Sequence, residues 1–150
     1  MARQQPAKGE LGWRMGQKIL IVDDNSMIRS SLRSWIEGNA DWRVCGEAEN
    51  GQIAVEKVET MRPDIVILDL QMPVMNGLEA ARQISHVAPN TAMVMFTMHP
   101  STELLKVAQT VGVREVVSKA DQLSGPLLVA LKQICAPRCR DRETTPGTQG

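Results

Sequence analysis

Three short runs of apolar residues limit the folds open to this chain of 150 residues. Ile19–Val22, Ile65–Leu68 and Ala92–Phe96 are each apolar from end to end. Such unbroken runs are typical of β-strands buried on both faces, as in a parallel sheet that helices cover on either side. Trp42–Gly46 and Val116–Val117 are weaker strand candidates, which we expect nearer the edges of the sheet.

Amphipathic stretches lie between and after these runs and predict five helices. Asn25 or Ser26 is the expected N-cap of the first helix, and Asn76 that of the third. The alternation of strands and helices predicts an α/β fold, with a doubly wound five-stranded parallel sheet and right-handed crossovers. The apolar stripes of the helices are Ile28, Leu32, Trp35 and Ile36; Ala54, Val58 and Met61; Leu78, Ala81 and Ile84; Leu104, Leu105, Ala108 and Val111; and Leu127, Leu128, Leu131, Ile134 and Cys135.

The two ends of the chain fall outside this alternation. We interpret residues 1–16 as a flexible lead-in and residues 136–150 as a polar tail or the start of a linker, which leaves one domain over residues 17–135. Seventeen basic and seventeen acidic residues give a net charge of zero. No overall field therefore favours direct binding to nucleic acid or to a membrane surface.

Cysteine usage and hydropathy indicate a cytoplasmic protein. Cys45, Cys135 and Cys139 are odd in number and lack the spacing of metal ligands, so we expect reduced thiols, with Cys45 buried in a strand. No apolar run reaches the roughly 18 residues that span a bilayer. The polar N-terminus has no apolar segment typical of a signal peptide.

Polar side chains follow the predicted strands at their C-terminal ends. Asp23 and Asp24 follow the first run, Asp69 the second, Thr97 the third and Lys119 the last. Ligands of open α/β sheets bind beyond these ends, where the strand order reverses. Three converging carboxylates favour a bound cation, and an oxygen-only site suits Mg²⁺, with Mn²⁺ as the alternative. Carboxylates, a hydroxyl and an amine at one edge indicate phosphoryl transfer.

These motifs resemble the receiver domains of two-component response regulators. The matching segments are Ile19–Asp24 (ILIVDD), Asp69–Gly77 (DLQMPVMNG), Phe96–Thr97 and Lys119. The resemblance extends from Gln17 to about Ile134, and the residues around Thr97 and Lys119 are most similar to the LuxR-type (NarL/FixJ) branch. It implies a flavodoxin-like sheet with strand order 2-1-3-4-5 and five helices.

The resemblance also implies a role for each of these residues. Asp69 would accept a phosphoryl group from a histidine kinase or phosphotransfer protein, in a Mg²⁺-dependent reaction. Lys119 and Thr97 would contact the phosphoryl oxygens, and Asp23 would act on the metal largely through a water molecule. Such a domain is a signalling phosphoacceptor and not an enzyme with a separate substrate. The implied metal ligands are Asp23, Asp24, Asp69 and the backbone carbonyl of Gln71.

The sequence departs from the family pattern at two positions near Lys119. The family usually carries Tyr or Phe where this chain has Val116, so an aromatic switch cannot operate here. Many relatives have proline where this chain has Ala120, and a cis bond before Ala120 would cost about 2.5–4 kcal/mol. We expect coupling either to run through backbone shifts of the fourth helix or to be weak. Gln71 and His99 are placed to flank an attacking water and to tune the lifetime of the phosphorylated state.

Two enzyme classes are disfavoured, and one alternative function stays open. The turn after the first strand has no glycine for a dinucleotide, and Gln71 stands where a dehalogenase-type phosphatase needs a second acid. The alternative is a phosphate-independent docking or dimerisation module. Arg29 and Arg33 are interpreted as a solvated helix face, with kinase docking as the less favoured reading.

The expected output is a change in protein contacts. The resemblance implies a homodimer through the fourth helix, the last strand and the last helix. It also implies regulation of transcription through an output domain that is missing from this chain or separate from it.

Overall fold

A five-stranded parallel sheet forms the centre of the computed structural model, which describes residues 17–120 and 125–134. The strand order is β2-β1-β3-β4-β5, and every neighbouring pair is parallel. The predicted fold class and strand order are therefore confirmed, and the two weaker strand candidates are the edge strands. The strands are β1 (Gln17–Val22), β2 (Trp42–Ala48), β3 (Ile65–Leu68), β4 (Ala92–Thr97) and β5 (Val113–Ser118).

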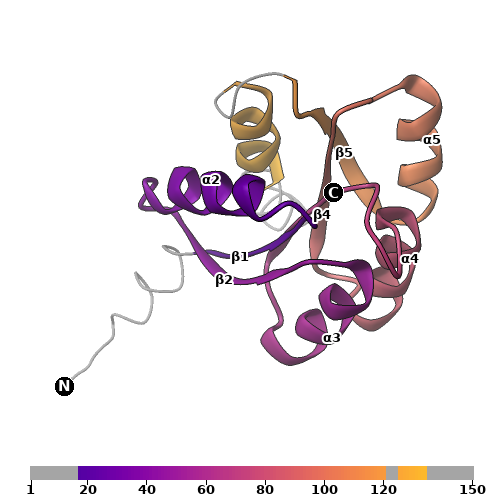
Figure 1. Cartoon of the computed structure of the whole chain (residues 1–150), viewed down its shortest axis with the longest axis horizontal. Helices are drawn as coiled ribbons and strands as arrows, with labels where there is room; N and C mark the ends of the chain where they lie inside the picture. The colour runs from indigo at the N-terminus through magenta and orange to yellow at the C-terminus, as the bar shows by residue number, and fades with distance from the viewer. Residues whose placement is uncertain (1–16, 121–124, 135–150) are drawn as a thin grey trace, which may run out of the picture.

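Helices alternate with the strands along the chain (Figure 1). In the described ranges there are five, as the sequence predicts, and none is long and apolar enough to cross a membrane. The helices are α2 (Ser26–Glu37), α3 (Gly51–Met61), α4 (Gly77–Val87), α5 (Thr102–Thr110) and a last helix over residues 126–134.

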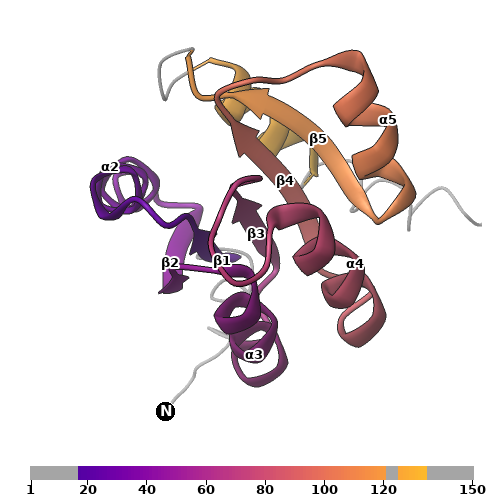
Figure 2. The ribbon, with the colours of Figure 1, turned by 45° about the vertical axis from the view of Figure 1, so that its right-hand side comes forward.

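The sheet separates two apolar cores. Alternate side chains of β1 point to opposite faces, so that Ile19 and Ile21 lie in one core and Leu20 and Val22 in the other. The first core is closed by α2 and the last helix, and the second by α3, α4 and α5. Figure 2 shows α3, α4 and α5 together on one side of the sheet. Burial on both faces explains why the central strands are continuous apolar runs.

Each labelled helix begins at a polar N-cap that directly follows a strand-end loop. Asn25 accepts hydrogen bonds from the amides of Met27 and Ile28, so Asn25 and not Ser26 is the N-cap of α2. Asn76 caps α4 as predicted, through the amide of Glu79. These caps fix the lengths of the loops that leave the carboxyl ends of the strands.

The environment of Cys45 differs from the prediction. Cys45 lies in β2 as expected, but its side chain is only half-buried. Ile19 pairs with Val44 and Leu20 pairs with Gly46, so Cys45 is the extra residue at a shift in register. An edge strand with such a bulge leaves one face incompletely covered. Cys135 and Cys139 lie outside the described residues.

Candidate functional site

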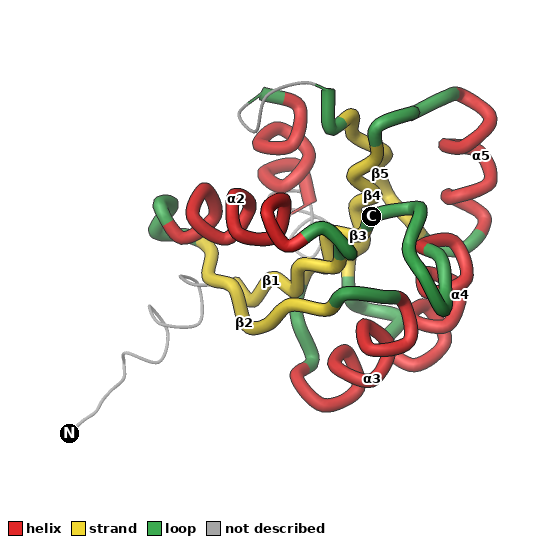
Figure 3. Tube along the Cα trace, viewed as in Figure 1, coloured by secondary structure: helices red, strands yellow, loops and turns green. Residues whose placement is uncertain are grey.

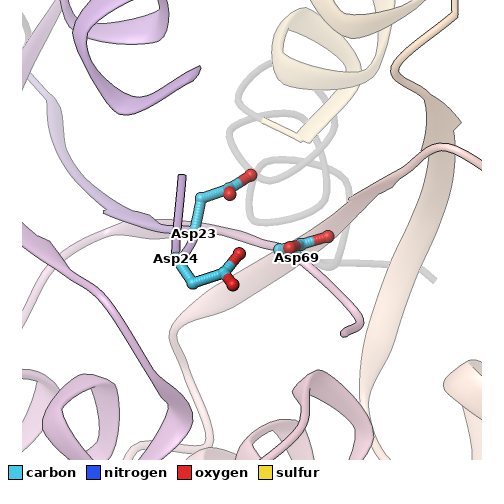
Figure 4. Close-up of side chains that lie close together, drawn as sticks. All are labelled: Asp23, Asp24 and Asp69. Carbon is cyan, nitrogen blue, oxygen red and sulfur yellow. The ribbon is translucent and has the colours of Figure 1, made fainter. Parts of the chain in front are cut away.

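Three carboxylates meet beyond the ends of β1 and β3. The two strands are neighbours, and the last pair in register, Val22 and Leu68, directly precedes Asp23 and Asp69. Ligand oxygens of Asp23, Asp24 and Asp69 all lie within 4.8 Å of one another. Figure 3 shows the loops that leave this edge of the sheet, and Figure 4 shows the three side chains grouped there. The convergence predicted from the sequence is therefore present.

A lysine from the opposite side of the site contacts two of these carboxylates. The Nζ of Lys119 lies 2.7 Å from Oδ2 of Asp23 and 3.1 Å from Oδ1 of Asp69. All three side chains are at least nine-tenths buried, whereas Asp24 is exposed. Buried charges are costly unless they are paired, which the ammonium group does for the two inner acids. The third acid faces solvent.

Burial raises the pKa of the Asp69 carboxyl group, and the negative charge of Asp23 raises it further. The hydrogen bond and charge of Lys119 act in the opposite direction without cancelling the shift. Burial alone would lower the pKa of Lys119, but its bonds to Asp23 and Asp69 raise it overall. The ammonium group is thus held protonated, while Asp69 retains an uncompensated cost of ionisation.

Thr97 and Lys119 are joined through the backbone. The amide of Lys119 donates a 2.7 Å hydrogen bond to the carbonyl of Thr97, which continues the pairing of β4 with β5. The Thr97 side chain is buried, and its hydroxyl oxygen accepts a 3.4 Å hydrogen bond from the amide of His99. The hydroxyl and the amine therefore stand on adjacent strand ends, as the sequence predicts.

The loop after Asp69 is shaped by one close contact and one unfavourable dihedral angle. A Cβ added to Gly77 would lie 2.1 Å from the carbonyl oxygen of Asp69, so only glycine fits at this position. The amide of Gly77 donates to the carbonyl of Leu70 at 2.7 Å, which closes the loop. Val74 has φ of 70°, a left-handed conformation that is costly for a β-branched residue.

The positions predicted to tune or switch the site lie in β5 or in the loops that follow β3 and β4. Gln71 and His99 are exposed and lie on the loops that follow Asp69 and Thr97. Val116 is half-buried and lines an open groove of about 550 Å³ with Pro100, Ser118 and residues of the last helix. The small side chain of Val116 thus borders this groove, beside the loop that follows Thr97.

One of the two arginines predicted on a solvated helix face is covered instead. The Arg33 side chain is 40% exposed, but the Arg29 side chain is only 17% exposed. Arg29 donates through Nη1 to the backbone carbonyl of Asp23 at 2.6 Å and through Nε to Glu47 at 2.9 Å. Glu47 lies eighteen positions after Arg29 in the sequence, so no local sequence pattern indicates this contact.

The donor set suits a hard divalent cation. All three side chains offer carboxylate oxygens, the ligands that Mg²⁺ prefers, and Asp24 is open to solvent. Asp23 has both oxygens engaged, Oδ1 by the amide of Asn25 and Oδ2 by Lys119. Burial, and after it the charge of Asp23, raises the pKa of the Asp69 carboxyl group, so a divalent cation beside it would favour the ionised form. The residues therefore fit a Mg²⁺ site, in which the exposed Asp24 would be one ligand and Asp69 another, since Lys119 and the Leu70 amide both bind the same Asp69 oxygen, Oδ1.

Comparisons with known proteins agree with this geometry. The family model of the response regulator receiver domain matches residues 19–125. The chain is 36% identical over 110 residues to the chemotaxis protein CheY of Thermotoga maritima, covering 73% of this chain and 91% of CheY. It is 41% identical over 88 residues to the transcriptional regulatory protein YdfI of Bacillus subtilis, covering 59% of this chain and 41% of YdfI.

Solved structures give the same result. A LuxR-family two-component response regulator from Aurantimonas sp. SI85-9A1 superposes with a TM-score of 0.76 at 30% identity, covering 81% of this chain and 86% of the other. The response regulator domain of Thermotoga maritima CheB superposes with a TM-score of 0.70 at 28% identity, covering 79% and 93%. The structural neighbours thus include LuxR-family regulators beside proteins of the CheY and CheB type.

Proposed function

The chain belongs to the response regulator receiver domain family, and on that basis we propose that Asp69 accepts a phosphoryl group in a Mg²⁺-dependent reaction. The observation that carries the proposal is the bridge of Lys119 between Asp23 and Asp69, beside the exposed Asp24. Such an arrangement offers a nucleophile, a cation and metal ligands within one small volume. A histidine kinase or phosphotransfer protein is the proposed donor.

In the proposed reaction, an oxygen of Asp69 attacks the phosphorus atom of a phosphohistidine. The phosphorus–nitrogen bond breaks as the phosphorus–oxygen bond forms, and the histidine nitrogen leaves and takes up a proton from solvent. Phosphoryl transfer requires alignment and charge neutralisation from the protein more than covalent chemistry. Lys119 would move from the Asp69 carboxylate to the phosphoryl oxygens, and the Thr97 hydroxyl would donate to another.

A bound Mg²⁺ would supply the charge that balances the phosphoryl oxygens and the carboxylates. Asp24, Asp69 and the backbone carbonyl of Gln71 are the proposed direct ligands. The engagement of both Asp23 oxygens by Asn25 and Lys119 supports a role for Asp23 through a water molecule. Mn²⁺ has the same preference for oxygen ligands and is the proposed substitute.

Gln71 and His99 are proposed to set the lifetime of the phosphorylated Asp69. Both are exposed on the two loops that border the carboxylate, where a water molecule would approach. Decay of the phosphorylated protein, followed by intact mass, should change in the Gln71→Ala and His99→Ala variants. Decay rates equal to those of the wild-type protein would remove this role.

The output of the domain is proposed to be a change in protein contacts. The face formed by α5, β5 and the last helix carries exposed Val107 and Val129, each about half exposed, and we propose it as the surface of a homodimer. The chain spans 41% of the length of the transcriptional regulatory protein YdfI. We therefore also propose an output domain that regulates transcription and is separate or missing. Two further predictions stay untested. The domain covers residues 17–135, with segments 1–16 and 136–150 outside it, and the protein is cytoplasmic.

A small phosphodonor tests the proposal directly. The protein is incubated with acetyl phosphate and Mg²⁺, and its intact mass is measured with time. We expect one labile phosphoryl group on the wild-type protein and none on Asp69→Asn or without the metal. Asp41→Asn is the matched control, because Asp41 is exposed and lies at the opposite end of β2.

The alternative is a docking or dimerisation module that needs no phosphate. Val116, in place of the usual aromatic residue, is the feature that favours it, because the residues that the structure describes there leave an open groove beside it. The buried contacts among Asp23, Asp69 and Lys119 speak against it, since a docking module has no need of them. Absence of phosphorylation by any donor, with the oligomeric state unchanged by Mg²⁺, would favour this alternative.

A further inference from the structure

The backbone of Asp23 is held by the end of β2 at two points. Its amide donates a 3.0 Å hydrogen bond to the carbonyl of Ala48, the last residue of β2. Its carbonyl accepts a 2.6 Å hydrogen bond from Nη1 of Arg29. Glu47, the residue before Ala48, binds Nε of the same guanidinium group at 2.9 Å. Residues of β2 therefore fix both polar groups of the Asp23 main chain, one directly and one through Arg29.

Glu47 is itself fixed in place from two other directions. Its second carboxylate oxygen accepts a 2.7 Å hydrogen bond from Nε of Arg33. Its backbone carbonyl accepts a 2.6 Å hydrogen bond from Nζ of Lys57 on α3. The hydrogen bonds and charges of Arg33 and, to a smaller extent, Arg29 lower the pKa of Glu47, so its carboxylate stays charged and binds Arg29. The guanidinium group is thereby aimed at the Asp23 carbonyl.

The bond from Arg29 acts on the outer metal ligand through the peptide unit. The Asp23 carbonyl and the Asp24 amide belong to one planar group, so fixing that carbonyl fixes the start of Asp24. The Asp24 side chain is exposed and would otherwise take several orientations. Restraining a ligand before the metal binds reduces the entropy lost on binding.

We propose that Arg29 is a positioning residue that orients Asp24 for a divalent cation by holding the Asp23 carbonyl. This inference deepens the proposed function and depends on it. The inference and simple electrostatics predict opposite changes in Mg²⁺ affinity when Arg29 is removed. A positive charge near three carboxylates opposes cation binding, so its removal alone would strengthen binding. Loss of positioning would weaken binding instead.

Arg33 provides a matched control. It carries the same charge on the same helix, four residues further on, and binds the other oxygen of Glu47. Its other contact is with Glu37, so Arg33→Gln removes a cation and a bond to Glu47 while leaving the bond from Arg29 to Asp23 intact. Arg29→Gln removes that bond. The difference between these two variants isolates the contact with the carbonyl.

The experiment is a calorimetric titration of the metal-free proteins with MgCl₂ alone. We expect Arg29→Gln to raise the Kd for Mg²⁺ roughly tenfold, the lower end of the range for residues that orient a metal ligand. Arg33→Gln should stay within about twofold of the wild-type protein. Arg29→Lys keeps the charge but not the fork that reaches Asp23 and Glu47 together, so its Kd should lie between the two.

Hydrogen exchange of the metal-free proteins gives a second readout. The amides of Asp23, Asp24 and Asn25 should exchange faster in Arg29→Gln than in Arg33→Gln, at equal far-ultraviolet circular dichroism. If Arg29→Gln fails to fold, Arg29→Lys distinguishes the two explanations. A positioning role predicts that Arg29→Lys binds Mg²⁺ more weakly than the wild-type protein, whereas a pure charge effect predicts no change.

Three results would overturn the inference. The first is Mg²⁺ binding by Arg29→Gln that is equal to or tighter than that of the wild-type protein. The second is equal weakening in Arg29→Gln and Arg33→Gln. The third is a wild-type protein that binds no Mg²⁺, which would contradict the proposed function and this inference together. The first two results leave the proposed function standing.

Discussion

Helices α4 and α5 cover the same face of the sheet, yet they are held very differently. Helix α4 follows the loop that begins at Asp69 and buries Gly77, Ala80, Ala81 and Ile84. Helix α5 follows the loop that begins at Thr97 and buries Ala108 alone. Figure 2 shows both helices on the same side of the sheet. Asp69 is therefore followed by a helix with four buried residues, and Thr97 by a helix with one.

This difference indicates that α5 can move at a smaller cost in free energy than α4. Segments with few buried apolar contacts open with smaller free energies than the core does. Val107 on α5 is 49% exposed, and the groove beside Val116 borders the loop before this helix. A displacement of Thr97 can therefore carry α5 with it at small cost, which suits the shift of this helix expected from the sequence.

The largest expected effect compares one apolar side chain on each helix. Ile84 of α4 is fully buried, so Ile84→Ala should lower the free energy of unfolding by about 2–5 kcal/mol. Leu104 of α5 is half-buried, and Leu104→Ala should cost about 1 kcal/mol. Urea unfolding of both variants measures the difference. Equal losses would show that α5 is anchored as firmly as α4.

A second test compares the first residues of the two helices. Gly77→Ala places a Cβ against the Asp69 carbonyl, and the required shift should cost about 1–3 kcal/mol and slow phosphorylation of Asp69. Thr102→Ala, at the first position of α5, changes an exposed residue and should change stability by less than about 0.5 kcal/mol. A Gly77→Ala protein that unfolds and accepts phosphate like the wild-type protein would contradict the close contact.

Ionisation of the buried Asp69 carboxyl group also lowers the stability of the folded protein. Burial and Asp23 raise the pKa of Asp69, so the folded, metal-free protein binds this proton more tightly than the unfolded chain does. Stability should therefore fall as pH rises from about 4, the pKa of an unfolded Asp, through the raised value. Asp69→Asn removes this loss, so the metal-free variant should unfold a few degrees higher than the wild-type protein at pH 7.

Thermal unfolding at several pH values measures this difference. The advantage of Asp69→Asn should shrink toward pH 4 and also when Mg²⁺ is added, since the cation stabilises the ionised wild-type carboxylate. A variant less stable than the wild-type protein at pH 7 without metal would mean that the bond to Lys119 outweighs the burial of Asp69.

The smallest effect concerns strain in the loop that joins Asp69 to α4. Val74 has φ of 70° and is 74% exposed, so Val74→Gly relieves the backbone and gives up little burial. Glycine also gains freedom in the unfolded chain, which offsets part of the relief of backbone strain. We therefore expect a net stabilisation of about 0.5–1 kcal/mol. Chemical unfolding measures it. A loss of stability would mean that the loop relaxes in solution to a conformation that valine prefers.

The central strands and the site acids were predictable because both follow from local patterns. Ile65–Leu68 is apolar on both faces, and Asp69 directly follows it. The edge strands were less visible, because Arg114 and Glu115 face solvent and interrupt the apolar pattern of β5. The exposure of Cys45 could not be predicted, since it results from a shift in register with β1. The proposed role of Arg29 depends on its contact with Glu47, which lies on another element, β2. The periodicity of a helix or a strand does not indicate such a contact.

The hydrogen bond between the Lys119 amide and the Thr97 carbonyl has a consequence for timing. Two loops that share this bond cannot move independently while it lasts, so displacement of one carries the other. A half-switched form, with one loop displaced and the other at rest, would have to break it. A switch driven by the proposed phosphorylation of Asp69 should therefore be entered and left in one cooperative step, with both loops returning together when the phosphoryl group is lost.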